Sequence, residues 1–119
     1  MDFLPIFIDI RNRNCLVVGG GEVAARKAAL LLRAGARVTI VAPQLCEELD
    51  ARLLEQGGEQ PRQPGIAHHA ETFCSGHLAD AVLVIAATDD PAVNRKVSEV
   101  AKGLCIPVNV VDDPASCSF

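Results

Sequence analysis

The chain has 119 residues, half of them hydrophobic, and four phenylalanines are its only aromatic residues of the Phe, Trp and Tyr class. This length is enough for one domain with its own buried core, so we expect a single domain over residues 1–119. The formal net charge of −4 argues against nucleic acid or an anionic membrane surface as the main partner.

The five cysteines, at positions 15, 46, 74, 105 and 117, are an odd number without a CxxC spacing. Such usage indicates reduced thiols in a cytosolic protein, and we expect most of them to be small core residues. The opening residues lack the basic region of a signal peptide, and no apolar stretch approaches the length of a transmembrane helix. The sequence therefore predicts a soluble, cytoplasmic protein.

The first predicted elements surround a glycine-rich stretch. Residues 3–10 indicate a short edge strand or an extended segment. Cys15–Val18 form an unbroken apolar run, which is typical of a parallel strand buried on both faces. Residues 22–34 are rich in strong helix formers, and Gly35 stands where a glycine commonly ends a helix.

The spacing Gly19-x-Gly21-x-x-Ala24 lies between this strand and this helix, as in a dinucleotide-binding fingerprint with Ala in the third place. Gly19 permits a tight turn, Gly21 lets a pyrophosphate approach the backbone, and Ala24 allows the helix to pack closely on the strand. The helix begins near Glu22 and points its unpaired N–H groups at that phosphate. The stretch predicts nucleotide binding, with a structural turn that holds no ligand as the alternative.

Strands and helices alternate along the rest of the chain. We expect strands at 37–42, 66–70, 81–87 and 106–111, helices at 46–55 and 91–102, and a loop at 56–65. Pro91 suits the first turn of the last helix, with Asp89 or Asp90 as its N-cap. The alternation predicts an α/β fold, a Rossmann-like, doubly wound and mostly parallel sheet with helices on both faces.

Three segments are expected to meet at the carboxyl ends of these strands, where open α/β sheets bind ligands. They are the glycine loop, residues 88–90 and residues 111–113. Thr88 and Asp89 suit capping of the next helix slightly better than contact with a ligand. Asp112 follows a buried strand with no helix pattern behind it. It is therefore either a turn residue or a carboxylate beside a cofactor, where it can accept a proton or meet a metal ion.

The position that usually carries a ribose-binding acid lacks one here. In dinucleotide-binding folds that acid usually follows the second strand, but residues 41–44 here are VAPQ. These residues include no arginine for a 2′-phosphate either. This position therefore does not decide between NAD and NADP. Arg26 and Lys27 either help to hold phosphate or an anionic substrate, or are solvated helix charges.

The histidines lie in the part of the sequence with the weakest pattern. His68 and His69 are neighbours on a predicted strand and point to opposite faces, so they do not easily share an ion. We expect His68, His69 and His77 to be surface residues. Cys74 and His77 are near enough for a metal pair but have no partner pair, so we predict no metal-ligating residue.

Three segments, in order, resemble the siroheme synthase amino-terminal family, which consists of precorrin-2 dehydrogenase/sirohydrochlorin ferrochelatase domains. They are LPIFIDIRNRNCLVVGGGEVAARKAALLLRAGARVTIVAP at 4–43, VIAATDDPAVN at 84–94 and VNVVDDPASCSF at 108–119. The resemblance covers most of the chain and fails mainly across 56–80.

The resemblance implies a bifunctional enzyme of tetrapyrrole biosynthesis. Family members use NAD to oxidise precorrin-2 to sirohydrochlorin, and many then insert ferrous iron, a substrate, to give siroheme. The family's catalytic aspartate lies in the motif NVVD, which implies that Asp112 accepts the proton lost as hydride leaves and later assists removal of pyrrole protons. The family's NAD contacts map onto Glu22, Val23, Pro43 and Gln44, and the last two would hold the adenosine end through backbone and shape. The predicted cofactor-binding residues are thus Gly19, Gly20, Gly21, Glu22, Val23, Ala24, Pro43, Gln44, Thr88 and Asp89.

Two departures from the family pattern modify this expectation. The family domain continues into a helical dimerisation region, which implies a homodimer in a full-length form, whereas this sequence ends at Phe119 and is either a piece of such a domain or unusually short. A polycarboxylated tetrapyrrole also needs cationic partners, which an acidic chain supplies sparsely, so we expect the isolated chain to bind NAD and catalyse little. The alternatives are a non-catalytic NAD-sensing module, which usually keeps the ribose-binding acid, and a chelatase-only homologue without a working nucleotide pocket.

Overall fold

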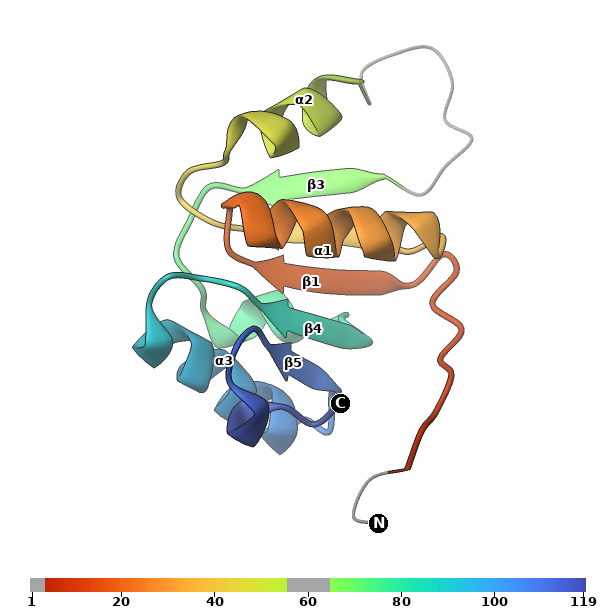
Figure 1. The fold of residues 1–119 in the computed structure, drawn as a ribbon, viewed down its shortest axis with the longest axis vertical. Helices are drawn as coiled ribbons and strands as arrows, with labels where there is room; N and C mark the ends of the chain where they lie inside the picture. Colours follow the sequence, from red (N-terminus) through yellow and green to blue (C-terminus); the bar gives the residue numbers. More distant parts are fainter. Residues whose placement is uncertain (1–3, 56–64) are drawn as a thin grey trace.

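A parallel sheet of five strands, in the order β3-β2-β1-β4-β5, forms the centre of the computed structural model, which describes residues 4–55 and 65–119. The strands are β1 (Asn14–Val18), β2 (Arg37–Val41), β3 (Ile66–His69), β4 (Leu83–Ala86) and β5 (Val108–Val110). The helices are α1 (Glu22–Arg33), α2 (Glu47–Glu55) and α3 (Pro91–Gly103), with 3₁₀ turns η1 (Ser75–Leu78) and η2 (Pro114–Ser116). In Figure 1 the labelled strands all point the same way, so their carboxyl ends share one edge. The predicted Rossmann-like, doubly wound fold is confirmed.

The central strand β1 is apolar without interruption because both of its faces are covered. Cys15 and Val17 pack in the cluster that also contains the buried side chains of α1 and α2. Leu16 and Val18 pack in the opposite cluster, with the buried side chains of α3. Figure 1 shows α1 in front of the sheet and α3 beside β4 and β5. The sheet is therefore the middle layer of three, as the sequence predicts.

Helix α1 packs closely on the sheet because small residues form its buried face, with Ala24 and Ala28 fully buried. Its last residue is Arg33, and Gly35, with a φ of +85°, stands just past the C-cap Ala34, where it stops the helix as predicted. The N–H of Ala36 donates to the carbonyl of Leu31 at 3.1 Å, which closes the helix with a glycine turn. Across 4–55 and 65–119, no helix has the length and apolar content needed to cross a membrane.

Several boundaries differ from the sequence prediction for local reasons. Strand β3 forms where the pattern was weakest, over Ile66–His69. Strand β5 begins later than expected, because the Ile106 N–H donates to the carbonyl of Ala101 in α3 at 2.9 Å and Pro107 has no N–H. Residues 4–10 lie outside the sheet, so the extended alternative holds there, and Phe3 and most of the predicted 56–65 loop lie outside the described residues.

The segment after η2 runs back along the outer side of β5. The N–H of Val108 donates to the hydroxyl of Ser118 at 2.8 Å, and the Ser118 N–H donates to the Val108 carbonyl at 2.7 Å. The N–H of Val110 is 3.1 Å from the thiol sulfur of Cys117. These contacts occupy the backbone groups of β5 that do not face β4.

The expectation that most cysteines are core residues holds for three of the five, because Cys15 is a core residue and Cys46 and Cys117 pack against the two core clusters. All are free thiols, and Cys15 alone of the five is fully buried, which raises its pKa to about 11. Cys74 and Cys105 are exposed, and Cys46 and Cys117 are partly buried. Cys105 lies at a φ of +59° in the turn that follows α3.

Candidate functional site

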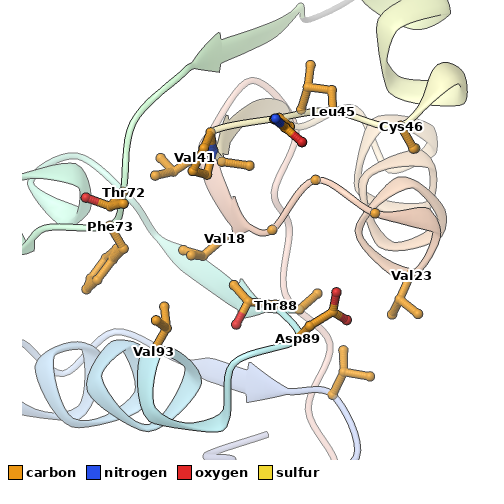
Figure 2. Close-up of a pocket in the computed structure, with 18 of the residues that line it drawn as sticks. Val18, Val23, Val41, Leu45, Cys46, Thr72, Phe73, Thr88, Asp89 and Val93 are labelled. Carbon is orange, nitrogen blue, oxygen red and sulfur yellow. The ribbon is translucent and has the colours of Figure 1, made fainter.

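A cavity of about 810 Å³ opens at the carboxyl ends of β1, β2 and β4. Every predicted site residue except Ala24 lies on its wall, and Ala24 is instead on the buried face of α1, packed in the core. In Figure 2, Phe73 and Val93 lie on one side of the cavity, and Val23 and Cys46 lie on the other. The structure therefore brings the glycine loop, the β4 exit loop and Asp112 together, as the sequence predicts.

The first two glycines of the loop are required by neighbouring backbone. Gly19 has a φ of +133°, and a Cβ there would collide with the carbonyl of Ala87. A Cβ on Gly20 would collide with the carbonyl oxygen of Gln44, and the Gly20 carbonyl accepts from the N–H of Cys46 at 2.7 Å. Gly20 thus allows the β2–α2 loop to pack against the glycine loop, a role that the sequence prediction missed.

The third glycine faces open space. Gly21 is the N-cap of α1, makes no side-chain cap, and would have no atom within 4 Å of an added Cβ. The N–H groups in the first turn of a helix have no intrahelical acceptor, and no side chain among the described residues caps them here. A helix start of this kind suits a phosphate group, so the residues present fit the pyrophosphate of a dinucleotide.

The β4 exit loop is fastened by a residue that the sequence prediction did not single out. Asn94 of α3 is buried, and its side-chain oxygen accepts from the Thr88 N–H at 3.1 Å and from the Thr88 hydroxyl at 2.6 Å. Its amide nitrogen donates to the Thr88 carbonyl at 3.0 Å. The sequence feature that could have revealed this role is the helical spacing of Asn94 with Val97 and Ala101, which puts the asparagine on the buried face of α3.

The N-cap of α3 is Asp90, one of the two residues predicted for it, and its side chain accepts from the Ala92 N–H at 2.9 Å. The expectation that Thr88 and Asp89 serve as helix caps is wrong. Thr88 is held by Asn94 instead, and both Thr88 and Asp89 lie on the cavity wall.

Asp112 is a turn residue, which is one of the two interpretations that the sequence left open. Its φ is +61°, in a turn that the Asp113 N–H closes by donating to the Val110 carbonyl at 3.3 Å. Within the described residues its exposed carboxylate has no hydrogen bond or ion pair. Asp112 lies on the wall of the large cavity and also of a second cavity of about 510 Å³, to which Lys27 contributes. Val111 and Asp112 are thus shared by the walls of the two cavities.

A further stretch of the cavity wall comes from the region where the family resemblance fails. Glu71, Thr72 and Phe73 follow β3 and line the large cavity. The carboxylate of Glu71 accepts from His77 Nε2 at 2.9 Å, and this hydrogen bond lowers the pKa of Glu71. Residue patterns did not predict this contribution, because it depends on a contact across six positions of irregular chain.

The prediction of surface histidines holds for His69 alone. The side chain of His77 is 10% exposed, and its Nδ1 accepts from the Cys74 N–H at 3.0 Å. His68 is partly buried, and its Nε2 lies 2.8 Å from the Ala42 carbonyl oxygen. Among the residues that the structure describes, no group of three His, Cys, Asp or Glu side chains is placed to hold a metal ion.

Comparisons with known proteins agree with this geometry. The family described as "Putative NAD(P)-binding" matches residues 6–119. The chain is 68% identical to a siroheme synthase of Nitrosospira multiformis and 53% identical to one of Nitrosomonas europaea, in each case over all of this chain and 24% of the relative. It thus spans about a quarter of the length of these relatives.

A solved structure named SirC, precorrin-2 dehydrogenase, aligns with a TM-score of 0.76 and 27% identity, over 91% of this chain and 50% of that one. The siroheme synthases and this structure confirm the predicted resemblance. The chain belongs to the NAD(P)-binding family whose match covers residues 6–119, in the form that siroheme synthases carry.

Proposed function

We propose that this chain is the NAD-binding part of an enzyme that dehydrogenates precorrin-2 to sirohydrochlorin in siroheme biosynthesis. The observation that carries the proposal is the position of Asp112 on the wall of both cavities. A carboxylate there can serve a nucleotide in the larger cavity and a substrate in the smaller one. The names of the relatives and of the solved neighbour support the choice of reaction.

The larger cavity supplies the groups that a dinucleotide needs. The uncapped start of α1 offers N–H groups to the phosphates, and the backbone around Pro43 and Gln44 borders the adenosine end. Thr88, fixed by Asn94, and Asp89 form the facing wall. When bound, NAD supplies the hydride acceptor for the oxidation.

Asp112 handles the proton of the same reaction. Removing two electrons and two protons from precorrin-2 sends one hydride to the nicotinamide and releases one proton. The exposed carboxylate of Asp112 accepts this proton and returns it to solvent. Because no described hydrogen bond or ion pair engages this carboxylate, the proton transfer breaks no structural contact.

We extend the proposal to the insertion of ferrous iron, as a substrate, into sirohydrochlorin. Asp112 then accepts the pyrrole protons that the metal displaces. Lys27 offers one cation to a substrate carboxylate in the smaller cavity, and the remaining cations come from residues outside this chain. The full-length protein is a cytoplasmic homodimer in this proposal.

Replacement of Asp112 by Asn tests the catalytic role. The chain, in place of the segment it matches in the Nitrosospira multiformis siroheme synthase, is assayed by absorbance for precorrin-2 oxidation and, separately, for iron insertion. Loss of a positioned proton acceptor should slow oxidation by about 100-fold or more, while calorimetry finds NAD affinity within about twofold of the parent. Asp80→Asn, an exposed carboxylate outside both cavities, is the matched control.

Other outcomes separate the alternatives. Oxidation at the parental rate in Asp112→Asn contradicts the catalytic assignment. Iron insertion without NAD binding by the parent identifies a chelatase-only protein, and NAD binding without oxidation or insertion identifies a sensing module.

A further inference from the structure

The end of β2 carries no acidic residue, but the neighbouring strand brings one to the same place. Strands β2 and β3 are parallel, with Val41 in register with His69. The carbonyl of His69 accepts from the N–H of Ala42 at 3.2 Å and from the N–H of Glu71 at 2.8 Å. Because one oxygen binds both N–H groups, the backbone of Glu71 lies beside that of Ala42. Ala42 is the residue directly before Pro43.

Glu71 lines the large cavity, and two histidines lie beside its carboxylate. One of its oxygens, Oε1, accepts from His77 Nε2 at 2.9 Å and lies 3.5 Å from His69 Nδ1. His77 is itself fixed, since its Nδ1 accepts from the Cys74 N–H and its side chain is 10% exposed. The second oxygen, Oε2, makes no hydrogen bond within the described residues. The hydrogen bond at Oε1 thus holds the Glu71 carboxylate in place, while Oε2 can still accept a hydrogen bond from a hydroxyl.

The charges around the cavity favour a hydroxyl over a phosphate at this position. Four carboxylates line the cavity, from Glu22, Glu71, Asp89 and Asp112, and no lysine or arginine is among the described lining residues. A 2′-phosphate next to Glu71 would meet a like charge without a cation to offset it. A free 2′-hydroxyl instead donates a hydrogen bond to the carboxylate.

We propose that Glu71 replaces the acid that is missing after β2, and that its carboxylate accepts a hydrogen bond from the adenosine ribose 2′-hydroxyl of NAD. His77 is the positioning residue that orients Glu71. This assignment rests on the proposed nucleotide site and makes Glu71 the residue that selects NAD over NADP.

Calorimetric titration of the 119-residue chain tests the assignment with three probes: NAD, NADP, and an NAD analogue without the adenosine 2′-hydroxyl. The parent should bind NAD about tenfold more tightly than either of the others, which is the effect of one hydrogen bond to a charged acceptor. Glu71→Gln should bind NAD and the deoxy analogue within about twofold of each other. Glu71→Arg should prefer NADP, since an arginine accommodates the 2′-phosphate.

Glu47→Gln removes an exposed carboxylate of α2 that does not line the cavity, and it should keep the parental ratios. Equal affinity of the parent for NAD and the deoxy analogue overturns the role of Glu71 and leaves the proposed function in place. So does a Glu71→Gln variant with the parental ratios. A parent that binds neither NAD nor NADP contradicts the proposed function, and the Glu71 assignment with it.

Discussion

Gly20 and Gly21 are adjacent in one loop, yet they lack side chains for different reasons. At Gly20 the space for a Cβ is occupied by the Gln44 carbonyl, so the fold itself excludes any larger residue. At Gly21 that space is open, and Gly21 is the N-cap of α1, whose first N–H groups suit a phosphate. The fingerprint thus combines a packing requirement with a binding requirement, and the two are separable by substitution.

Gly20→Ala should lower the free energy of unfolding by about 3 kcal/mol, because the methyl group forces the β2–α2 loop away from the glycine loop. Gly21→Ala should cost less than about 1 kcal/mol, the difference between glycine and alanine at an N-cap. It should nevertheless weaken NAD binding by about tenfold or more, since the methyl group enters the space for phosphate. Urea denaturation measures the first effect and calorimetry the second. Equal stability losses in the two variants would contradict this division.

At the scale of elements, the site depends on how the β4 exit loop joins α3. Asn94 lies on the buried face of the helix and makes three hydrogen bonds to the backbone and hydroxyl of Thr88. Asp90 caps the helix between them. The position of the loop that lines the cavity is therefore set by a side chain on the buried face of α3.

Asn94→Ala should cost about 2–3 kcal/mol in urea denaturation, because it removes the partner of the N–H and of the carbonyl of partly buried Thr88. NAD affinity should fall as well, since the loop loses its anchor. Lys96→Ala, an exposed substitution on the same helix, is the control and should stay within about 0.5 kcal/mol of the parent. Unchanged NAD affinity in Asn94→Ala would show that backbone hydrogen bonds alone hold the loop.

The predictable parts of this fold are those that obey a local rule. The apolar run before Gly19, the glycine that ends α1 and the proline that opens α3 each act within a few residues, so the strands and helices follow from the sequence. Glu71 and His77 reach the site through an irregular segment, and their contact depends on β3 lying beside β2. No pattern along the chain encodes such a contact, which is why a surface position was expected for His77.

For the whole molecule, burial is concentrated at the middle of the sheet. Strand β1 pairs with β2 on one side and β4 on the other, and helices cover both of its faces. Residues 4–9, in contrast, are exposed. The stability of the chain against local opening should follow the same gradient, from this strand outward.

Amide hydrogen exchange should report this gradient directly. The amides of Leu16 and Val17 should exchange only through global unfolding, so that their opening free energy equals the value from urea denaturation. Amides of residues 6–9 should exchange at least about 1,000-fold faster, because they belong to no helix or strand. Similar protection in β1 and in residues 6–9 would contradict this picture.

The return of residues 117–118 along β5 has a consequence for self-association. A bare outermost strand offers a row of backbone donors and acceptors on which another chain can align and grow an intermolecular sheet. Here Ser118 and Cys117 already occupy the N–H groups of Val108 and Val110 on that side. This border of the sheet is thus closed to strand addition, and it gives a concentrated solution no template there for aggregation.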